Sequence, residues 1–374
     1  MKILNIVGAR PNFMKVAPIH RRLNAHDRFT SGIVHTGQHY DQEMSDIFFE
    51  QLGLPRPDEY LGVGSGDHAD QTAEIMKAFK TVVETEAPDL VVVVGDVNST
   101  VACSLVATKR QIPVVHVEAG LRSGDRSMPE EVNRIVTDRI ADLLFVTEQS
   151  GVDNLRSEGV SDDKIAFVGN VMIDALVRFR EKAAQTPIVD DLGLEEGNYV
   201  VMTMHRPSNV DEKDQLEVVL QTIQQICEDR SLVFPMHPRT KARIEEFGLD
   251  EELSRIDGLQ VLPPQGYLEF LALMDQAGAV VTDSGGIQEE TTFLGVPCIT
   301  LRPNTERPVT IREGTNELME LNPGAVSQRV VERMGNRMNG QTPELWDGRT
   351  SERIVEHIDS RFHPDAVLSH EESR

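Results

Sequence analysis

The stretch "LVVVVGDVNSTVACSLVATKRQIPVVHVE", residues 90–118, decides which fold the sequence predicts. It begins and ends with Val-rich apolar runs, and a helical pattern fills the segment between them. Continuous apolar runs are typical of strands buried on both faces, as in a parallel sheet that helices cover on both sides. The stretch therefore predicts a strand, a helix and a second, parallel strand.

This alternation extends outward to both ends of the chain. "KILNIV" and "SGIVHT" precede the stretch as strand candidates, and "LLFVT" and "KIAFVG" follow it. Charge, proline and glycine interrupt the pattern at residues 181–198, after which "YVVMTM", "SLVFPM", "LQVLP", "AVVTD" and "VPCIT" resume it. A chain of 374 residues is long for a single core. We predict an α/β protein of two Rossmann-like, doubly wound domains facing across a cleft, at residues 1–175 and 176–349.

The net charge restricts the class of partner. A formal charge of -24 argues against nucleic-acid binding, because the phosphate backbone repels such a surface and no basic run counters it. The cations are 9 Lys and 28 Arg. An acidic, solvated surface is one way to stay soluble in high salt, where charges are screened. Two interpretations stay open: a high-salt adaptation, and an ordinary acidic cytoplasmic protein.

The apolar runs also bear on whether the chain spans a membrane. Runs such as residues 90–94 are far shorter than the roughly 20 residues that a bilayer span requires. The N-terminal "MKILNIVGARP" lacks a cleavage site of small residues and fits a buried strand better than a signal peptide. We therefore expect a cytoplasmic protein with no membrane span.

The three cysteines, Cys103, Cys227 and Cys298, are too far apart for C-x-x-C motifs. We therefore expect their side chains to pack in the core, with neither disulfides nor zinc.

A glycine turn gives the most specific local signal. In "VVTDSGGIQEET", residues 280–291, a strand ends near Ser284 and a helix begins on Gly285 and Gly286. Glycines let a ligand approach the backbone, and the N–H groups at a helix N-terminus suit a phosphate. Glu289 or Glu290 can accept hydrogen bonds from ribose hydroxyls. The turn predicts a nucleotide-diphosphate site; the alternative is a tight turn whose glycines serve packing alone.

Further polar residues follow predicted strands, where ligands bind in open α/β sheets. Arg10 and Lys15 can clamp a diphosphate, although solvated surface charges also explain them. Asp96, Glu118 and Glu130 belong to one sheet, and neighbouring carboxylates can act as acid and base in one reaction. The alternative is that some of these carboxylates are helix caps.

One histidine and several missing motifs complete the inventory. His205, followed by Arg206 in "MHRPSN", can act as acid, base or phosphate ligand, or be structural. No G-x-x-x-x-G-K-[ST] or H-E-x-x-H occurs, and "GVGSGD", at residues 62–67, is not a G-x-G-x-x-G after a strand. The sequence therefore gives little support to three other functions: P-loop hydrolase, zinc protease and dinucleotide-dependent dehydrogenase.

Nine motifs together resemble the non-hydrolysing UDP-N-acetylglucosamine 2-epimerases in order and approximate spacing. They are "GARPNFMKVAP", "TGQHYD", "GDVNST", "HVEAGLRSGD", "MPEEVNR", "GNVMIDAL", "HRPSN", "TDSGGIQEE" and "TERP". The resemblance covers about residues 1–320. It implies a fold similar to the two-domain glycosyltransferases called GT-B, an active site in the cleft, and a C-terminal helix, at about residues 350–374, that packs back on the first domain.

The resemblance also implies roles for individual residues. The catalytic constellation it implies is Arg10, Lys15, Asp96, Glu118, Glu130 and His205. The further substrate-binding residues are Arg206, then Gln265 and Phe270 for uracil, Ser284, Gly285 and Gly286 for the diphosphate, Glu290 for ribose, and Arg307 for the nucleotide or sugar. A regulatory site for a second UDP-sugar is implied at Gln38, His39, Gln71 and His237.

The implied reaction makes chemical sense of these residues. The C2 proton of UDP-N-acetylglucosamine (UDP-GlcNAc) is not next to a carbonyl, so its loss must be coupled to departure of UDP. The resemblance implies elimination to 2-acetamidoglucal and UDP, then re-addition, by a homodimer without metal or redox cofactor. Four alternatives stay open: a hydrolysing epimerase, an epimerase of a UDP-2,3-diacetamido uronic acid, a GT-B glycosyltransferase, and a non-catalytic nucleotide-sugar sensor.

Overall fold

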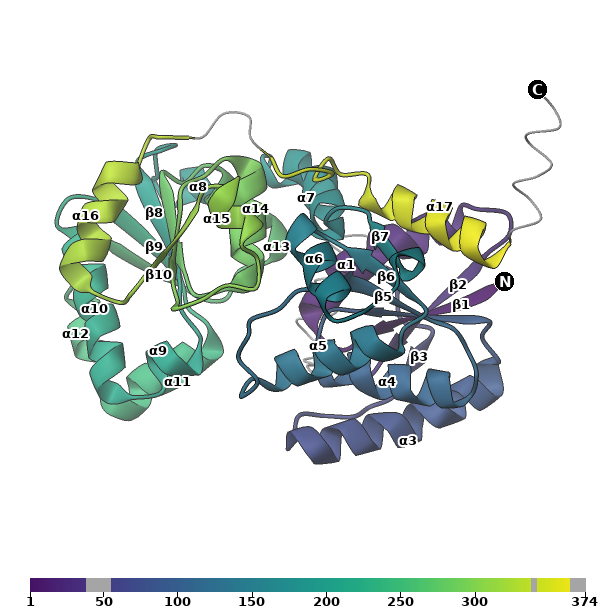
Figure 1. Cartoon of the computed structure of the whole chain (residues 1–374). Helices are drawn as coiled ribbons and strands as arrows, with labels where there is room; N and C mark the ends of the chain where they lie inside the picture. Colours follow the sequence, from purple (N-terminus) through teal and green to yellow (C-terminus); the bar gives the residue numbers. More distant parts are fainter. Residues whose placement is uncertain (38–54, 338–341, 364–374) are drawn as a thin grey trace, which may run out of the picture. The chain divides into compact units, whose positions relative to one another are not determined.

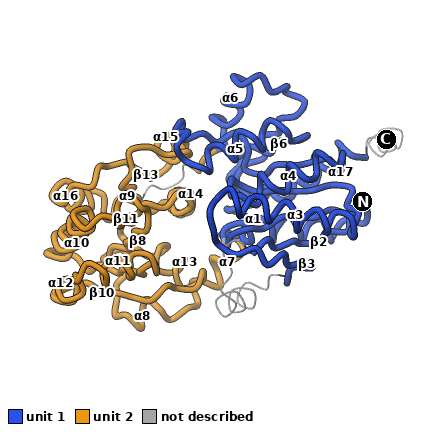
Figure 2. The backbone as a smooth tube through the Cα atoms, turned by 90° about the horizontal axis from the view of Figure 1, so that it is seen from below, with its two compact units in different colours: residues 1–177, 344–374 blue, residues 178–343 orange. Residues whose placement is uncertain are grey.

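Parallel strands make up both sheets of this protein, whose computed structural model describes residues 1–37, 55–337 and 342–363. The chain divides into two units, which Figure 2 colours separately. Unit 1 comprises Met1–Val177 and Glu344–Arg374, and unit 2 comprises Arg178–Pro343. The predicted fold class, α/β with two doubly wound sheets, is confirmed.

Unit 1 has seven strands among its described residues, in the order β3-β2-β1-β4-β5-β6-β7. Every neighbouring pair is parallel. The strands are β1 (Lys2–Val7), β2 (Thr30–His35), β3 (Glu59–Tyr60), β4 (Leu90–Val94), β5 (Val114–Ala119), β6 (Leu143–Val146) and β7 (Ile165–Phe167). All five residues of β4 are buried, as expected for a strand that helices cover on both faces.

Helices cover both faces of this sheet (Figure 1). On one face α4 packs between α3 and α5, and an apolar cluster joins α3 and α4 to β1 and β4. On the other face α1 packs against α17. The bounds are α1 (Arg10–Asn24), α3 (His68–Glu86), α4 (Asn98–Lys109), α5 (Pro129–Ile140), α6 (Gln149–Ser157), α7 (Val171–Ala183) and α17 (Thr350–Phe362). Within the described part of the chain, no helix is long and apolar enough to cross a membrane.

The C-terminal segment returns to unit 1 through specific contacts. Trp346 is 2% exposed, and its Nε1 donates to the carbonyl of Thr147 at 3.0 Å. The carboxylate of Asp174, in the first turn of α7, accepts the N–H groups of Thr350 (2.9 Å) and Ser351 (2.7 Å). N–H groups in the first turn of a helix have no partner within the helix, so Asp174 caps α17.

Unit 2 has a six-stranded sheet among its described residues, in the order β10-β9-β8-β11-β12-β13. Counted within the unit this is the 3-2-1-4-5-6 order of the Rossmann fold. The strands are β8 (Tyr199–Thr203), β9 (Ser231–Pro235), β10 (Leu259–Leu262), β11 (Ala279–Thr282), β12 (Cys298–Leu301) and β13 (Asn316–Met319). The helices are α8 (Ile188–Asp191), α9 (Pro207–Val210), α10 (Lys213–Cys227), α11 (Pro238–Phe247), α12 (Asp250–Ser254), α13 (Tyr267–Asp275), α14 (Gly285–Leu294), α15 (Val309–Arg312) and α16 (Pro323–Arg333).

Candidate active site

Glu118 has an unusual backbone conformation within β5. Its φ is 70°, and the pairing of β5 with β6 shifts register between Val117 and Ala119. A non-glycine residue in the left-handed region costs free energy, and a bulge of this kind redirects a side chain. The local structure therefore aims the carboxylate of Glu118 away from the regular strand direction.

Lys15 is the partner of Glu118 in unit 1. The Lys15 ammonium forms an ion pair and hydrogen bond with Oε2 of Glu118, and both side chains are buried. Asn12, one turn earlier on α1, accepts the N–H of Ala9 at 2.9 Å and donates to the carbonyl of Val94 at 3.2 Å. The first turn of α1 is thus fastened to the end of β4, beside the Lys15 and Glu118 pair.

Asp96, two residues after the end of β4, belongs to a second charged group. Arg134 is 3% exposed and pairs with both Asp96 and Glu131. Glu131 also accepts the N–H groups of Ser123 (3.0 Å) and Gly124 (3.1 Å). The predicted Glu130 lies beside this group, yet its carboxylate makes no hydrogen bond or ion pair with other described residues. Sequence reasoning missed Glu131 and Arg134, which lie at i and i+3 on α5.

A buried pair behind this region connects β5 to α5. His116 Nδ1 lies 2.7 Å from Oδ1 of Asp138, and His116 Nε2 lies 2.8 Å from the carbonyl of Gly95. Burial alone would raise the pKa of Asp138, but His116 and Arg122 together lower it. These contacts hold Gly95, the residue before Asp96, whose φ of 68° suits glycine.

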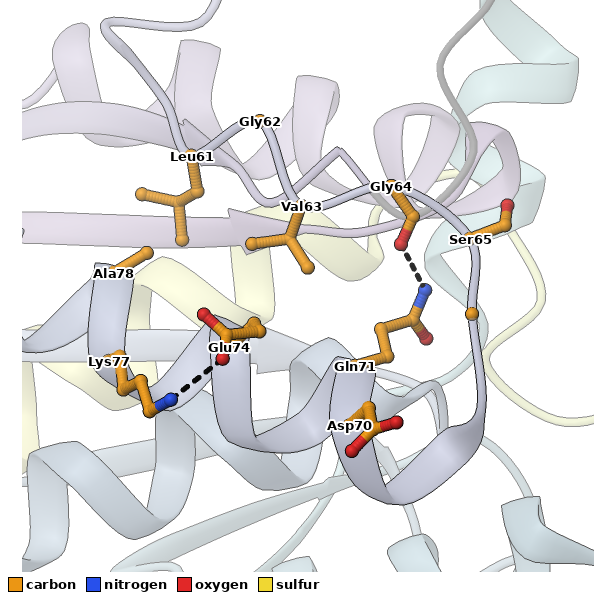
Figure 3. Close-up of a pocket in the computed structure, with 11 residues that line it drawn as sticks. Leu61, Gly62, Val63, Gly64, Ser65, Asp70, Gln71, Glu74, Lys77 and Ala78 are labelled. Atoms are coloured by element: carbon orange, nitrogen blue, oxygen red, sulfur yellow. Dashed lines mark hydrogen bonds and ion pairs between the residues drawn. The ribbon is translucent and has the colours of Figure 1, made fainter.

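The residues implied for a regulatory site are only partly described. Gln38 and His39 lie outside the described residues, and so does the side chain of Arg10. Gln71, on α3, lines a groove of about 630 Å³ beside residues 61–66, where its Nε2 donates to the carbonyl of Gly64 at 2.8 Å (Figure 3). Its Oε1 accepts a hydrogen bond from Nδ2 of Asn98 at 2.8 Å, so both the nitrogen and the oxygen of the Gln71 amide are hydrogen-bonded within unit 1.

In unit 2 the predicted glycine turn begins α14. Ser284 is the N-cap residue, and its N–H donates to Oγ1 of Thr282 at 3.0 Å. A Cβ at Gly285 would lie 2.9 Å from Nη1 of Arg307, so the glycine lets that guanidinium approach the turn. Arg307 in turn contacts Glu289, with 2.5 Å between Nε and Oε1. Arg307, predicted from a separate motif, thus lies beside the predicted turn at Gly285.

Asp283 fastens the predicted His205 segment to this turn. Its carboxylate is 0% exposed and accepts the backbone N–H groups of His205 (3.0 Å) and Arg206 (2.8 Å). His205 Nδ1 lies 3.0 Å from Oδ1 of the same carboxylate. Burial opposes ionisation, but the contacts with His205 and Arg206 lower the pKa of Asp283. Sequence reasoning missed Asp283.

His237, implied for the regulatory site, lies beside His205, with 5.2 Å between the ring centroids. It caps α11 by accepting the N–H of Arg239 on Nδ1 at 3.1 Å. Burial, with the charge of His205, lowers the pKa of His237. A neutral ring is what this cap requires, because Nδ1 must accept.

The predicted nucleoside residues lie on α13 and α14. Glu290 on α14 is 4% exposed and accepts the hydroxyl of Tyr267 at 3.0 Å. Phe270 is half-buried one turn after Tyr267 on α13. Gln265, before the helix, donates from Nε2 to the carbonyl of Pro263 at 2.7 Å. Within the described ranges, no three His, Cys, Asp or Glu side chains gather as a metal ion would require.

Comparison with known proteins decides the family. The sequence model of the UDP-N-acetylglucosamine 2-epimerases matches residues 21–359. The chain belongs to this family. The UDP-N-acetylglucosamine 2-epimerase of Methanocaldococcus jannaschii is 42% identical over 360 residues, which are 95% of this chain and 98% of that protein.

A solved structure of the same M. jannaschii enzyme and one further relative refine the comparison. A crystal structure of the M. jannaschii UDP-GlcNAc 2-epimerase, in complex with UDP-GlcNAc and UDP, matches with a TM-score of 0.88 over 96% of this chain and 99% of that one, at 42% identity. The UDP-2,3-diacetamido-2,3-dideoxy-D-glucuronate 2-epimerase of Pseudomonas aeruginosa is 39% identical over 365 residues, 96% of this chain and 99% of that protein.

Proposed function

We propose that this chain interconverts UDP-GlcNAc and its C2 epimer UDP-ManNAc without hydrolysing either one. The observation that carries the proposal is the buried pair of Lys15 and Glu118 at the end of β5, in a member of this family. A strained backbone conformation, such as that of Glu118, is typical of a functional site. The complex of the M. jannaschii relative with UDP-GlcNAc and UDP supports the choice of substrate.

The reaction has two balanced steps. In the first, a base takes the C2 proton, the C–H electron pair forms the C1=C2 bond of 2-acetamidoglucal, and the C1–O bond breaks as UDP leaves with its electron pair. In the second, UDP adds back at C1 and a proton reaches C2 from the opposite face. Nothing is oxidised or reduced overall, so the protein must supply a base, an acid and stabilisation of the leaving group.

The chain offers groups for each task. Glu118 and Asp96 are the carboxylates that we assign to C2, with Glu130 as their partner and Arg10 and Lys15 as cations. In unit 2, we assign the diphosphate to Ser284, Gly285, Gly286, Arg307 and His205. The N-terminus of α14 and the guanidinium of Arg307 both favour an anion.

A second candidate substrate has its own support. The P. aeruginosa relative acts on a UDP-2,3-diacetamido uronic acid and is 39% identical, only slightly less than the M. jannaschii enzyme. Both substrates undergo epimerisation at C2, so the same base, acid and diphosphate site would serve either. The two sugars differ at C3 and C6, and direct comparison of both as substrates separates the candidates.

Nuclear magnetic resonance in deuterated water tests the reaction. With UDP-GlcNAc we expect UDP-ManNAc at equilibrium, with deuterium incorporated at C2 of both sugars. Free UDP with free ManNAc would instead identify the hydrolysing epimerase. No product from UDP-GlcNAc, together with turnover of the diacetamido uronic acid, would overturn the first candidate in favour of the second. UDP binding without turnover of either sugar would favour the nucleotide-sugar sensor.

The Glu118→Gln variant tests the assignment of the base. Glutamine keeps the size but cannot take a proton, so we expect kcat to fall by on the order of 10²- to 10⁴-fold. The affinity for UDP, measured by calorimetry, should stay near that of the wild type. Near-normal turnover in the variant would remove Glu118 from the mechanism.

We also propose a homodimer, which is the expectation that the family resemblance raised. Sedimentation equilibrium at the concentration of the activity assay measures the mass directly. A monomer that is fully active would contradict it.

A further inference from the structure

The hydroxyl of Tyr267 makes a single described contact, and that contact is the candidate ribose ligand. It donates to Oε1 of Glu290 at 3.0 Å, from the first residue of α13 to the middle of α14. Burial, reinforced by the charge of Glu290, raises the pKa of the Tyr267 hydroxyl. The hydroxyl is therefore a donor at neutral pH, and it fixes one oxygen of the Glu290 carboxylate.

The position of Tyr267 on α13 connects two candidate subsites. Phe270, the candidate uracil contact, comes three residues later on the same helix. Residues at i and i+3 lie on the same side of a helix about one turn apart. The first turn of α13 thus carries both the candidate base contact and the group that orients the candidate ribose ligand.

We propose that Tyr267 is a positioning residue that sets selectivity for the ribose hydroxyls by orienting Glu290. The inference rests on the proposed nucleotide site in unit 2. A carboxylate can turn its lone pairs in several directions, and a fixed donor on one oxygen limits that rotation. A site built to bind a hydroxyl rejects an analogue that lacks it, because its buried polar group is then left unpaired.

Calorimetry with UDP, 2′-deoxy-UDP and 3′-deoxy-UDP tests the proposal. We expect the wild type to bind UDP at least about tenfold more tightly than one of the deoxy analogues. In Tyr267→Phe the affinity for UDP should fall by roughly five- to tenfold, with little change for that analogue. In Glu290→Gln the preference should fall further, and the double variant should add little to Glu290→Gln alone.

Tyr199→Phe is the matched control. The hydroxyl of Tyr199 is also buried and donates to α13, at the carbonyl of Leu273 (2.7 Å), but it does not contact Glu290. Its loss should disturb the helix without changing selectivity. All three ligands should then weaken by the same factor, or not at all.

The outcomes separate the inference from the function on which it rests. If Tyr267→Phe weakens all three ligands equally, as a loosened helix would, Tyr267 is structural and the inference is wrong. If the wild type binds UDP and both deoxy analogues with equal affinity, Glu290 does not bind a ribose hydroxyl and the inference is wrong. If the wild type does not bind UDP, the proposed function itself fails. A preference that falls in Tyr267→Phe and persists in Tyr199→Phe supports the proposal.

Discussion

Single residues in this protein hold their positions through buried charge. Asp283 accepts two backbone N–H groups and contacts the ring of His205 from a fully buried position. A carboxylate in such a place is stable only if its partners compensate for lost hydration. This role is not visible in the sequence, where Asp283 is one of several polar residues around a glycine turn.

We expect Asp283→Asn to reduce stability in a pH-dependent way. The folded-state pKa of Asp283 is lowered from 3.8, so its contribution is present above that unfolded value and is lost as the pH falls through the folded one. At pH 7 the variant should be less stable than the wild type by about 2 kcal/mol. The difference should shrink below about pH 4.

Urea unfolding at several pH values measures this difference. Asp257→Asn is the control, since Asp257 is exposed and its carboxylate makes no hydrogen bond or ion pair with other described residues. A difference between wild type and Asp283→Asn that stays constant from pH 7 to about pH 3 would contradict the ionised state of the Asp283 carboxylate.

Strands were predicted wherever they contain a continuous apolar run, and the two that were missed lie at sheet edges. Eleven strands coincide with the apolar runs of the sequence, whereas β3 and β13 were not predicted. Both are terminal in their sheets, and their sequences, "EY" and "NELM", lack a continuous apolar run. The edge strands β7 and β10 do contain apolar runs and were predicted, so the missing signal in β3 and β13 is the apolar run itself.

The site residues on α5 show a second limit of sequence. Glu130 and Glu131 are neighbours in "MPEEVNR", but successive helical residues point about 100° apart. In the structure Glu131 pairs with the buried Arg134, and Glu130 does not. Which carboxylate faces inward depends on the rotation of the helix against β4 and β5, a tertiary property that motif order does not contain.

We expect the cap on α17 to stabilise unit 1 measurably. Asp174→Ala would leave the N–H groups of Thr350 and Ser351 unpaired in a buried place, at a cost of about 1–2 kcal/mol. Asp174→Asn keeps one acceptor oxygen and should cost less. Chemical denaturation followed by tryptophan fluorescence is a suitable measurement, because the single tryptophan, Trp346, is buried in unit 1. Equal stability of Asp174→Ala and wild type would show that the cap contributes nothing.

At the scale of the whole molecule, the two units have separate apolar cores but one shared excess of negative charge. Each sheet has its own cluster of buried residues, centred on β1 and β4 in unit 1 and on β8 and β9 in unit 2. The net charge of -24 belongs to the chain as a whole. Repulsion between like charges extends over roughly 10 Å at 0.1 M salt and only about 3 Å at 1 M, so added salt weakens it. Salt therefore tests a property that no single contact reveals.

We expect potassium chloride to raise the temperature at which Trp346 fluorescence reports unfolding. Screening of ordinary acidic repulsion should be nearly complete by about 0.5 M, so a rise that stops there fits an ordinary acidic protein. A rise that continues to about 2 M, with epimerase activity increasing in parallel, fits a high-salt adaptation. Activity that falls steadily from low millimolar salt upward would remove the high-salt interpretation. The charge would then be a matter of solubility, because net charge of this kind opposes association more than it determines a fold.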